Sequence, residues 1–155
     1  DEKPFLVCNA DVFTNIHLTN LYNTHLQKSP LATLAVRNRN SSRYLLFDDH
    51  DILFGWENIK TNAVKIPRKI PAEIKEQLAS HETYPLHEFA FSGYHIISPD
   101  IFKHQTRSGV FSMTDWYLDI CAQQTILAYH HDDDIWIDIG SPEQLQKANE
   151  ISSVR

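Results

Sequence analysis

The chain has 155 residues, of which 42% are hydrophobic, and its formal net charge is −6 with the nine histidines counted as neutral. This length fits one domain with a buried core. The acidic balance, and the absence of any run of more than two basic residues, exclude the basic surface that is typical of nucleic-acid-binding proteins. No apolar run reaches about 18 residues, so the sequence predicts no membrane span.

In the first half of the chain, apolar runs that are typical of strands alternate with an apolar spacing that is typical of helices. The predicted elements are a buried strand over residues 5–9, a helix over 16–26 that Pro30 ends, a strand over 31–36, a polar stretch over 37–43, a hairpin of strands 44–47 and 52–56 with an acidic turn, and a short helix over 72–80.

The second half continues the alternation. Its predicted elements are a strand over residues 89–97, a short helix over 98–103, a helix after Ser112 whose apolar residues Trp116, Tyr117, Leu118 and Ile120 face the core, strands over 125–129 and 135–139 on either side of a turn at 130–134, and a last helix over 143–151. Strands that alternate with helices indicate an α/β fold with a mixed sheet.

The two cysteines, Cys8 and Cys121, lie in an apolar strand and on an apolar helix face. We therefore expect two buried thiols, with neither a disulfide framework nor a zinc site. Together with the lack of a visible secretion leader, this favours a cytoplasmic location.

Two aspartates are the strongest functional signal, because each follows a short apolar strand. Asp11 closes residues 4–11, and Asp138 lies within residues 135–139. In an open α/β sheet, ligands bind outside the carboxyl ends of the strands. Two carboxylates brought together there fit a hard divalent cation, which usually carries phosphate. The pair therefore points to chemistry on a nucleotide.

Polar neighbours strengthen this interpretation. Asn9 lies two residues before Asp11, on the same face of the strand, and its amide can hold a ribose hydroxyl or a phosphate. After Asp138, Gly140 permits a tight exit, and residues 141–143 begin a helix whose start is electropositive.

Three segments carry a family resemblance. Residues 5–11 (Phe-Leu-Val-Cys-Asn-Ala-Asp) resemble the strand of the sugar-1-phosphate nucleotidyltransferases that ends in Gly-Asp or Asn-Gly-Asp. Residues 136–143 (Trp-Ile-Asp-Ile-Gly-Ser-Pro-Glu) resemble the Trp-x-Asp-x-Gly-Thr-Pro segment of that family, and residues 91–102 resemble its Phe-(Ser/Thr)-Gly segment. Among the members of that family, the chain looks like the bacterial mannose-1-phosphate guanylyltransferase-like and N-acetylmuramate-1-phosphate uridylyltransferase-like enzymes.

The resemblance implies a Rossmann-like nucleotidyltransferase fold and a set of residue roles. Asp11 and Asp138 would be the catalytic residues that hold Mg²⁺, and Asn9 would contact the nucleotide. The implied sugar contacts are Gly93, where the absent Cβ would let the backbone approach the sugar, and Glu57 and Asn58. These last two fall at the Glu-Lys-Pro segment of the family, whose Lys and Pro are replaced here, and an exposed polar turn is the alternative interpretation.

The implied reaction is attack of a sugar 1-phosphate on the α-phosphorus of a nucleoside triphosphate, which gives a nucleoside diphosphate sugar and pyrophosphate. The Gly-rich loop of the family, which cradles the triphosphate through backbone N–H groups, does not occur around any of the four glycines. We therefore expect residues 1–155 to be the C-terminal portion of a single catalytic domain, N-terminally incomplete and inactive alone. A truncated sheet would also expose an edge that invites association.

Two further hypotheses stay open. Residues 130–134 (His-His-Asp-Asp-Asp) contain an Asp-x-Asp pattern, the metal motif of nucleotide-sugar glycosyltransferases, which would place the metal at Asp132 and Asp134. A solvated hairpin turn is the simpler interpretation, because Asp is favoured at turns. The third hypothesis is a non-catalytic module that keeps the fold and binds a sugar phosphate.

Overall fold

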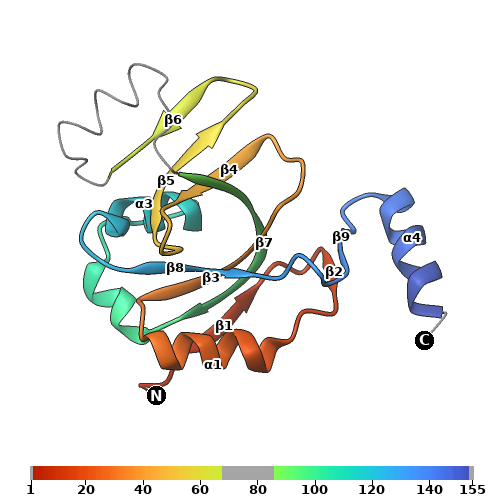
Figure 1. The fold of residues 1–155 in the computed structure, drawn as a ribbon, viewed down its shortest axis with the longest axis horizontal. Coiled ribbons are helices and arrows are strands. Elements are labelled where there is room, and N and C mark those ends of the chain that lie inside the picture. Colours follow the sequence, from red (N-terminus) through yellow and green to blue (C-terminus); the bar gives the residue numbers. More distant parts are fainter. Residues whose placement is uncertain (1, 68–85, 154–155) are drawn as a thin grey trace.

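The structure is a computed structural model, and it describes residues 2–67 and 86–153. Figure 1 shows the arrangement of the elements. In chain order they are β1 (Phe5–Cys8), β2 (Val12–Thr14), α1 (Leu18–Lys28), β3 (Ala32–Arg37), β4 (Arg43–Phe47), β5 (Leu53–Asn58), β6 (Ala63–Lys65), β7 (His87–Ile97), the 3₁₀-helix η1 (Pro99–His104), α3 (Met113–Cys121), β8 (Ile126–His130), β9 (Trp136–Asp138) and α4 (Pro142–Ser153). The helix predicted over 72–80 lies outside the described residues.

Within the described part of the chain, seven strands form one sheet and two form a separate ladder. The order in the large sheet is β6-β5-β4-β7-β3-β8, and β1 also pairs with β7. Only the pair of β3 and β8 is parallel, and the other described pairs of this sheet are antiparallel. The long strand β7 curves through the centre and joins β1, β3 and β4 (Figure 1). The predicted α/β fold with a mixed sheet is therefore confirmed.

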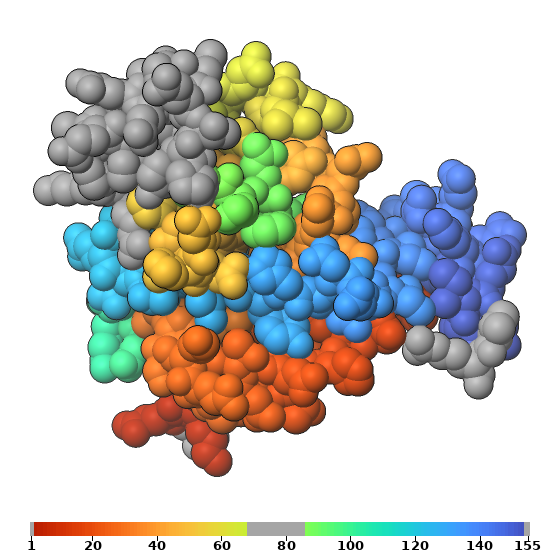
Figure 2. Space-filling model, in the orientation of Figure 1, coloured from red at the N-terminus to blue at the C-terminus, as the bar shows by residue number. Residues whose placement is uncertain are grey.

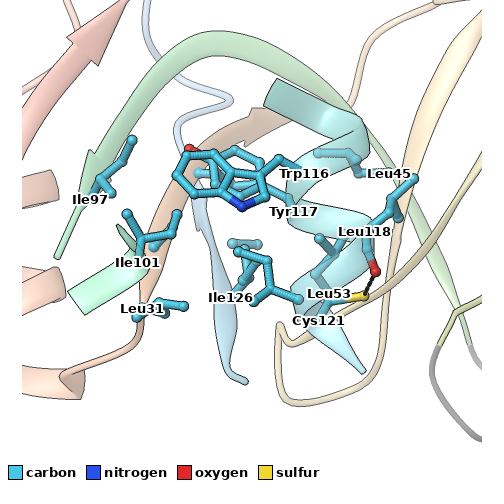
Figure 3. Close-up of a cluster of buried hydrophobic side chains, with 14 of the residues drawn as sticks. Leu31, Leu45, Leu53, Ile97, Ile101, Trp116, Tyr117, Leu118, Cys121 and Ile126 are labelled. Carbon is cyan, nitrogen blue, oxygen red and sulfur yellow. Dashed lines mark hydrogen bonds between the residues drawn. The ribbon is translucent and has the colours of Figure 1, made fainter. Parts of the chain in front are cut away.

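Helices α1 and α3 cover opposite faces of this sheet. Side chains alternate along a strand, so Leu34 and Val36 of β3 pack in the cluster that includes α3, whereas Ala35 packs with Leu21 of α1. The predicted core residues of α3 are confirmed as buried: Trp116, Tyr117, Leu118 and Ile120. Figure 3 shows how Trp116, Tyr117 and Leu118 pack against apolar side chains from the sheet and from η1.

Strand β1 differs from its prediction as a buried strand. Its exposure alternates, so Phe5 and Val7 pack against the core cluster while Leu6 and Cys8 face outward. The prediction of a buried thiol is therefore wrong for Cys8, which is exposed, and confirmed for Cys121. The physical reason is that the only described pairing of β1 is with β7 and that one of its faces is left uncovered.

The strands around residues 130–134 do not flank a hairpin turn. Strand β8 runs parallel to β3, and β9 pairs instead with β2, where Val12 lies opposite Asp138. Arg37, at the end of β3, donates through its guanidinium to the backbone carbonyl oxygens of Asp132 and Asp134. These bonds tie the turn to the large sheet, and the chain leaves the turn toward the separate ladder.

The ladder and α4 project from one side of the molecule (Figures 1 and 2). Of the residues of α4, only Ala148 is buried. No described helix is both long and apolar enough to cross a membrane.

Candidate functional site

The ladder of β2 and β9 brings the two predicted aspartates together. Asp11 lies in the turn before β2, and Asp138 is the last residue of β9. Val12 is the cross-strand partner of Asp138, and the N–H of Ile139 donates to the carbonyl oxygen of Asp11 at 2.8 Å. Two residues from opposite ends of the sequence therefore become neighbours on one edge of the ladder.

Gly140 lies between the two carboxylates. A Cβ added at Gly140 would meet Oδ1 of Asp138 at 3.0 Å and Oδ2 of Asp11 at 4.0 Å. The N–H of Gly140 donates to Oδ1 of Asp138 at 2.9 Å, which fixes the orientation of that carboxylate. One oxygen of each carboxylate therefore lies within 4.0 Å of the position that a side chain at Gly140 would take.

Gly140 and the two aspartates line an open cavity of about 670 Å³ at the junction of β9 and α4. We refer to it as the carboxylate cavity. Its lining residues are Asp11, Trp136, Ile137, Asp138, Gly140, Ser141, Gln144 and Lys147. Lys147, one helical turn from Gln144 and not predicted from the sequence, adds an ammonium group to the wall.

The donor set of the carboxylate cavity fits Mg²⁺. Asp11 and Asp138 supply only oxygen, which a hard cation prefers. Neither forms an ion pair within residues 2–67 and 86–153, so a divalent cation would offset the repulsion between them. Those residues contain no group of three or more His, Cys, Asp and Glu side chains that could hold a metal. Mg²⁺ would therefore take its remaining ligands from water and substrate phosphates, as is usual for this ion.

Two side chains at and just after β2 bind the start of β9, and no sequence pattern indicated either of them. The hydroxyl of Thr14 donates to the carbonyl oxygen of Ile135 at 2.6 Å. The amide oxygen of Asn15 accepts from the N–H of Ile135 at 2.6 Å. Both contacts fix the start of β9, and therefore the position of Asp138 opposite β2.

Trp136 connects the carboxylate cavity to the large sheet. Its indole N–H donates to the carbonyl oxygen of Ser92 at 2.9 Å. The guanidinium carbon of Arg39 lies 4.1 Å from the centre of the indole ring, within the range of a cation–π contact. Burial lowers the pKa of Arg39, the charge of Arg37 lowers it further, and the charge of Asp138 acts in the opposite direction.

Asn9 and Gly93 contact each other. The N–H of Asn9 donates to the carbonyl oxygen of Gly93 at 2.8 Å. Gly93 has a φ of +83°, and a Cβ there would lie 2.8 Å from Nδ2 of Asn9. Gly93 thus makes room for the side chain of Asn9, a reason that sequence reasoning did not find. The contacts of Asn9 with the nucleotide and of Gly93 with the sugar stay predictions.

The predicted sugar contacts on β5 lie away from the lining of the carboxylate cavity. Oε1 of Glu57 is buried, and none of the hydrogen bonds found among residues 2–67 and 86–153 reaches it. Burial and the nearby Glu88 raise the pKa of Glu57. The side-chain oxygen of Asn58 accepts from the N–H of Lys60 at 3.0 Å. This hydrogen bond fits the alternative interpretation, in which the residues form a polar turn. A sugar contact by either residue stays a prediction.

The turn at residues 130–134 is only partly solvated. Oδ1 of Asp132 accepts from the N–H of Asn38 at 2.6 Å. His131 is only 5% exposed, and its Nε2 lies 2.6 Å from the hydroxyl oxygen of Ser92. The predicted solvated turn is therefore wrong for His131, which packs against the sheet because the turn is tied to β3.

The fold is similar to that of several solved structures. A Bacillus anthracis protein assigned as a glucose-1-phosphate thymidylyltransferase, in complex with sucrose, superposes with a TM-score of 0.67 at 12% identity, over 97% of this chain and 55% of that one. The UTP-bound UGPase from Acinetobacter baumannii gives a TM-score of 0.67 at 14% identity, over 98% and 51% of the two chains. A UDP-glucose pyrophosphorylase complexed with UDP-glucose gives 0.63 at 19% identity, over 99% and 58%.

These structural neighbours are sugar-1-phosphate nucleotidyltransferases, and at these identities the likeness shows the fold. The chain spans about half the length of each. No family model and no curated protein sequence matches the chain.

Proposed function

We propose that this chain carries the metal-binding and sugar-side part of a Mg²⁺-dependent sugar-1-phosphate nucleotidyltransferase. In the reaction, an oxygen of the sugar 1-phosphate attacks the α-phosphorus of a nucleoside triphosphate, and pyrophosphate leaves as the nucleoside diphosphate sugar forms. The observation that carries the proposal is the convergence of Asp11 and Asp138 around Gly140. The fold of the structural neighbours supports it.

The residues of the carboxylate cavity would act by position and charge. Asp11 and Asp138 would hold Mg²⁺, which when bound supplies charge neutralisation for the phosphates. Lys147 lines the same cavity and would add a second positive charge for a phosphate oxygen. No protein nucleophile is required, since the sugar phosphate itself attacks, and alignment of the two substrates would supply much of the rate.

The family resemblance favours the mannose-1-phosphate guanylyltransferase-like and N-acetylmuramate-1-phosphate uridylyltransferase-like members. The Gly-rich triphosphate loop of the family is not found in these 155 residues. The function that we assign to these residues is therefore binding of the metal and of the sugar phosphate, and turnover would require the loop as well.

The test is metal binding by the chain itself. Mn²⁺, used as a spin probe for Mg²⁺, is titrated into the wild type and into Asp11→Asn and Asp138→Asn, and free Mn²⁺ is followed by electron paramagnetic resonance. We expect each variant to weaken binding by about tenfold or more, because each removes one of two carboxylate ligands. The matched control is Asp133→Asn, an exposed aspartate of the turn at 130–134, which should bind Mn²⁺ as the wild type does.

The same titration separates the other hypotheses. A glycosyltransferase site would lose Mn²⁺ on substitution of Asp132 or Asp134, and not of Asp138. If none of these substitutions changed Mn²⁺ binding, the metal assignment would be wrong, and a non-catalytic sugar-phosphate-binding module would be the better description.

A further inference from the structure

Arg39 joins the carboxylate cavity to a second cavity of about 230 Å³. Its guanidinium stacks on Trp136, which lines the first cavity, and the same arginine lines the second. We call this second space the arginine cavity. The described residues that line it include Arg39, Arg43, Ser41, Tyr44, Trp56 and Thr114.

The charge of the arginine cavity is unusual for this protein. Its described lining holds two arginines and no acidic side chain, although the chain as a whole has a net charge of −6. The guanidinium of Arg43 has no hydrogen-bond or ion-pair partner among the described residues. Two cations in a cavity whose described lining has no acidic side chain favour an anionic occupant.

Arg39 also lacks one partner. Its two terminal nitrogens donate to the carbonyl oxygens of Asn40 and Phe91, but the buried Nε has no acceptor among the described residues. A buried donor without an acceptor costs free energy, and more so when the group is charged. An oxyanion beside Arg39 would supply the missing acceptor and would also offset the burial of the guanidinium.

The rest of the lining is preorganised for a polyhydroxylated ligand. The phenol oxygen of Tyr44 accepts from the N–H of Ser41 at 2.8 Å, so the phenol proton is free to donate. The hydroxyl oxygen of Ser41 accepts from the N–H of Arg43 at 3.2 Å, which fixes the loop before β4. Trp56 adds an aromatic wall. Apolar walls with a few fixed polar groups are typical of small-molecule sites.

We propose that the arginine cavity binds an acidic substituent of the sugar, a carboxylate or a further phosphate, so that the substrate is an acidic sugar 1-phosphate. The proposal rests on the proposed function, in which the 1-phosphate lies at Asp11 and Asp138. Arg39 and Arg43 would bind the substituent, because a guanidinium pairs with two oxygens of a carboxylate or phosphate at once.

The test is calorimetric titration of the chain with three probes in the presence of Mg²⁺: glucose 1-phosphate, glucuronic acid 1-phosphate and glucose 1,6-bisphosphate. We expect one or both acidic probes to bind about tenfold more tightly than glucose 1-phosphate, and the tighter one identifies the substituent as carboxylate or phosphate. Arg43→Ala, at an exposed position, should abolish this preference, so that the acidic probes bind no more tightly than glucose 1-phosphate does. The control is Lys28→Ala, an exposed cation at the end of α1, which should keep the preference.

Equal affinity for the three probes, or a preference that survives in Arg43→Ala, would overturn the acidic-sugar assignment. Asp138→Asn separates this result from a failure of the proposed function. If Asp138→Asn bound all probes as the wild type does while Arg43→Ala lost the preference, the arginine cavity would stand as an acid-binding site and the metal assignment would fail. Loss of Mg²⁺-dependent binding in Asp138→Asn together with loss of the preference in Arg43→Ala would support both.

Discussion

The large sheet and the β2–β9 ladder with α4 differ sharply in how much of their side-chain surface is buried. In the sheet, whole side chains from β3, β4 and α3 are removed from solvent. Figure 3 shows part of this cluster, including Leu45 of β4 and Trp116 of α3. In α4 a single residue, Ala148, is buried, and the helix projects from the body (Figure 2). The candidate metal ligands lie on the second region.

This difference separates the source of stability from the source of site geometry. Burial of apolar surface stabilises the sheet, and the free energy gained is roughly proportional to the apolar area that is buried. The ladder has little such area, so a few hydrogen bonds at Thr14, Asn15 and Trp136 determine where Asp138 lies. Changes in the sheet should therefore affect folding first, and changes in the ladder should affect metal binding first.

The largest effect is expected in the core. Phe47 is fully buried at the end of β4, and Phe47→Ala should lower the free energy of unfolding by about 3–5 kcal/mol, because it removes a large side chain and leaves a cavity. The matched change in the other region is Leu145→Ala on α4, where the side chain is 45% exposed, and we expect a cost within about 0.5 kcal/mol. Urea unfolding measures both. Equal costs would show that α4 packs as firmly as the sheet, contrary to the comparison.

Acid should also destabilise the sheet through two buried histidines. Nδ1 and Nε2 of His25 lie 2.9 Å from the hydroxyl oxygens of Thr33 and Ser98, and Nδ1 of His95 lies 2.6 Å from the phenol oxygen of Tyr117. Burial lowers the pKa of each histidine to about 4. The unfolded chain, with a histidine pKa of about 6.5, therefore binds more protons between these values than the folded chain does.

The stability that depends on the neutral histidines is thus complete above about pH 6.5 and is lost as the pH falls toward the folded pKa. Each histidine should cost about 1–2 kcal/mol between pH 7 and pH 5. Urea unfolding at the two pH values measures the loss of stability. In His95→Gln this loss should be smaller than in the wild type by about 1–2 kcal/mol, which is the share of His95. His17→Gln, at an exposed position before α1, is the control. A pH dependence that did not change in His95→Gln would contradict the assignment.

A smaller effect is expected at the ladder. Thr14→Val removes the hydroxyl that donates to the carbonyl oxygen of Ile135 and accepts from the N–H of Ile16, at a cost of about 1 kcal/mol. Because this contact positions β9, we expect Mn²⁺ affinity to fall by about fivefold, which corresponds to the same free energy. The control is Thr19→Val, on the exposed surface of α1. If Thr14→Val lowered the stability but not the Mn²⁺ affinity, the ladder would not determine the geometry of the carboxylates.

The two regions also differ in what the sequence could predict. The strands and helices of the sheet carry long apolar periods, so their positions were predictable from residues such as Trp116 and Leu118. The convergence of Asp11 and Asp138 was predictable because each follows an apolar strand, although their role as metal ligands stays a prediction. The pairing of β9 with β2 was not predictable, because β2 is only three residues long and too short to show a hydrophobic period.

The contacts around Trp136 could not be predicted from the sequence either. Arg39 lies in a polar stretch that has the composition of a solvated loop, and nothing local marks the guanidinium that stacks on an indole far along the chain. The structural role of Gly93 depends on the neighbouring side chain of Asn9, which only the pairing of β1 with β7 brings close. Side chains that depend on long-range pairing leave no period in the sequence.

The smallest expected effect is that of replacing Gly140 by Ala in the ladder. The same replacement at Gly93, in the large sheet, allows a direct comparison of the two regions. In Gly140→Ala, the new Cβ would lie 3.0 Å from Oδ1 of Asp138, so the carboxylate must shift by a few tenths of an ångström. We expect Mn²⁺ affinity to fall about two- to threefold with no measurable loss of stability, since the position is exposed. In Gly93→Ala, the positive φ and the contact with Asn9 should cost about 1–3 kcal/mol of unfolding free energy. Loss of stability in Gly140→Ala, with unchanged Mn²⁺ binding, would mean that the ladder is a structural element and that its carboxylates are not a metal site.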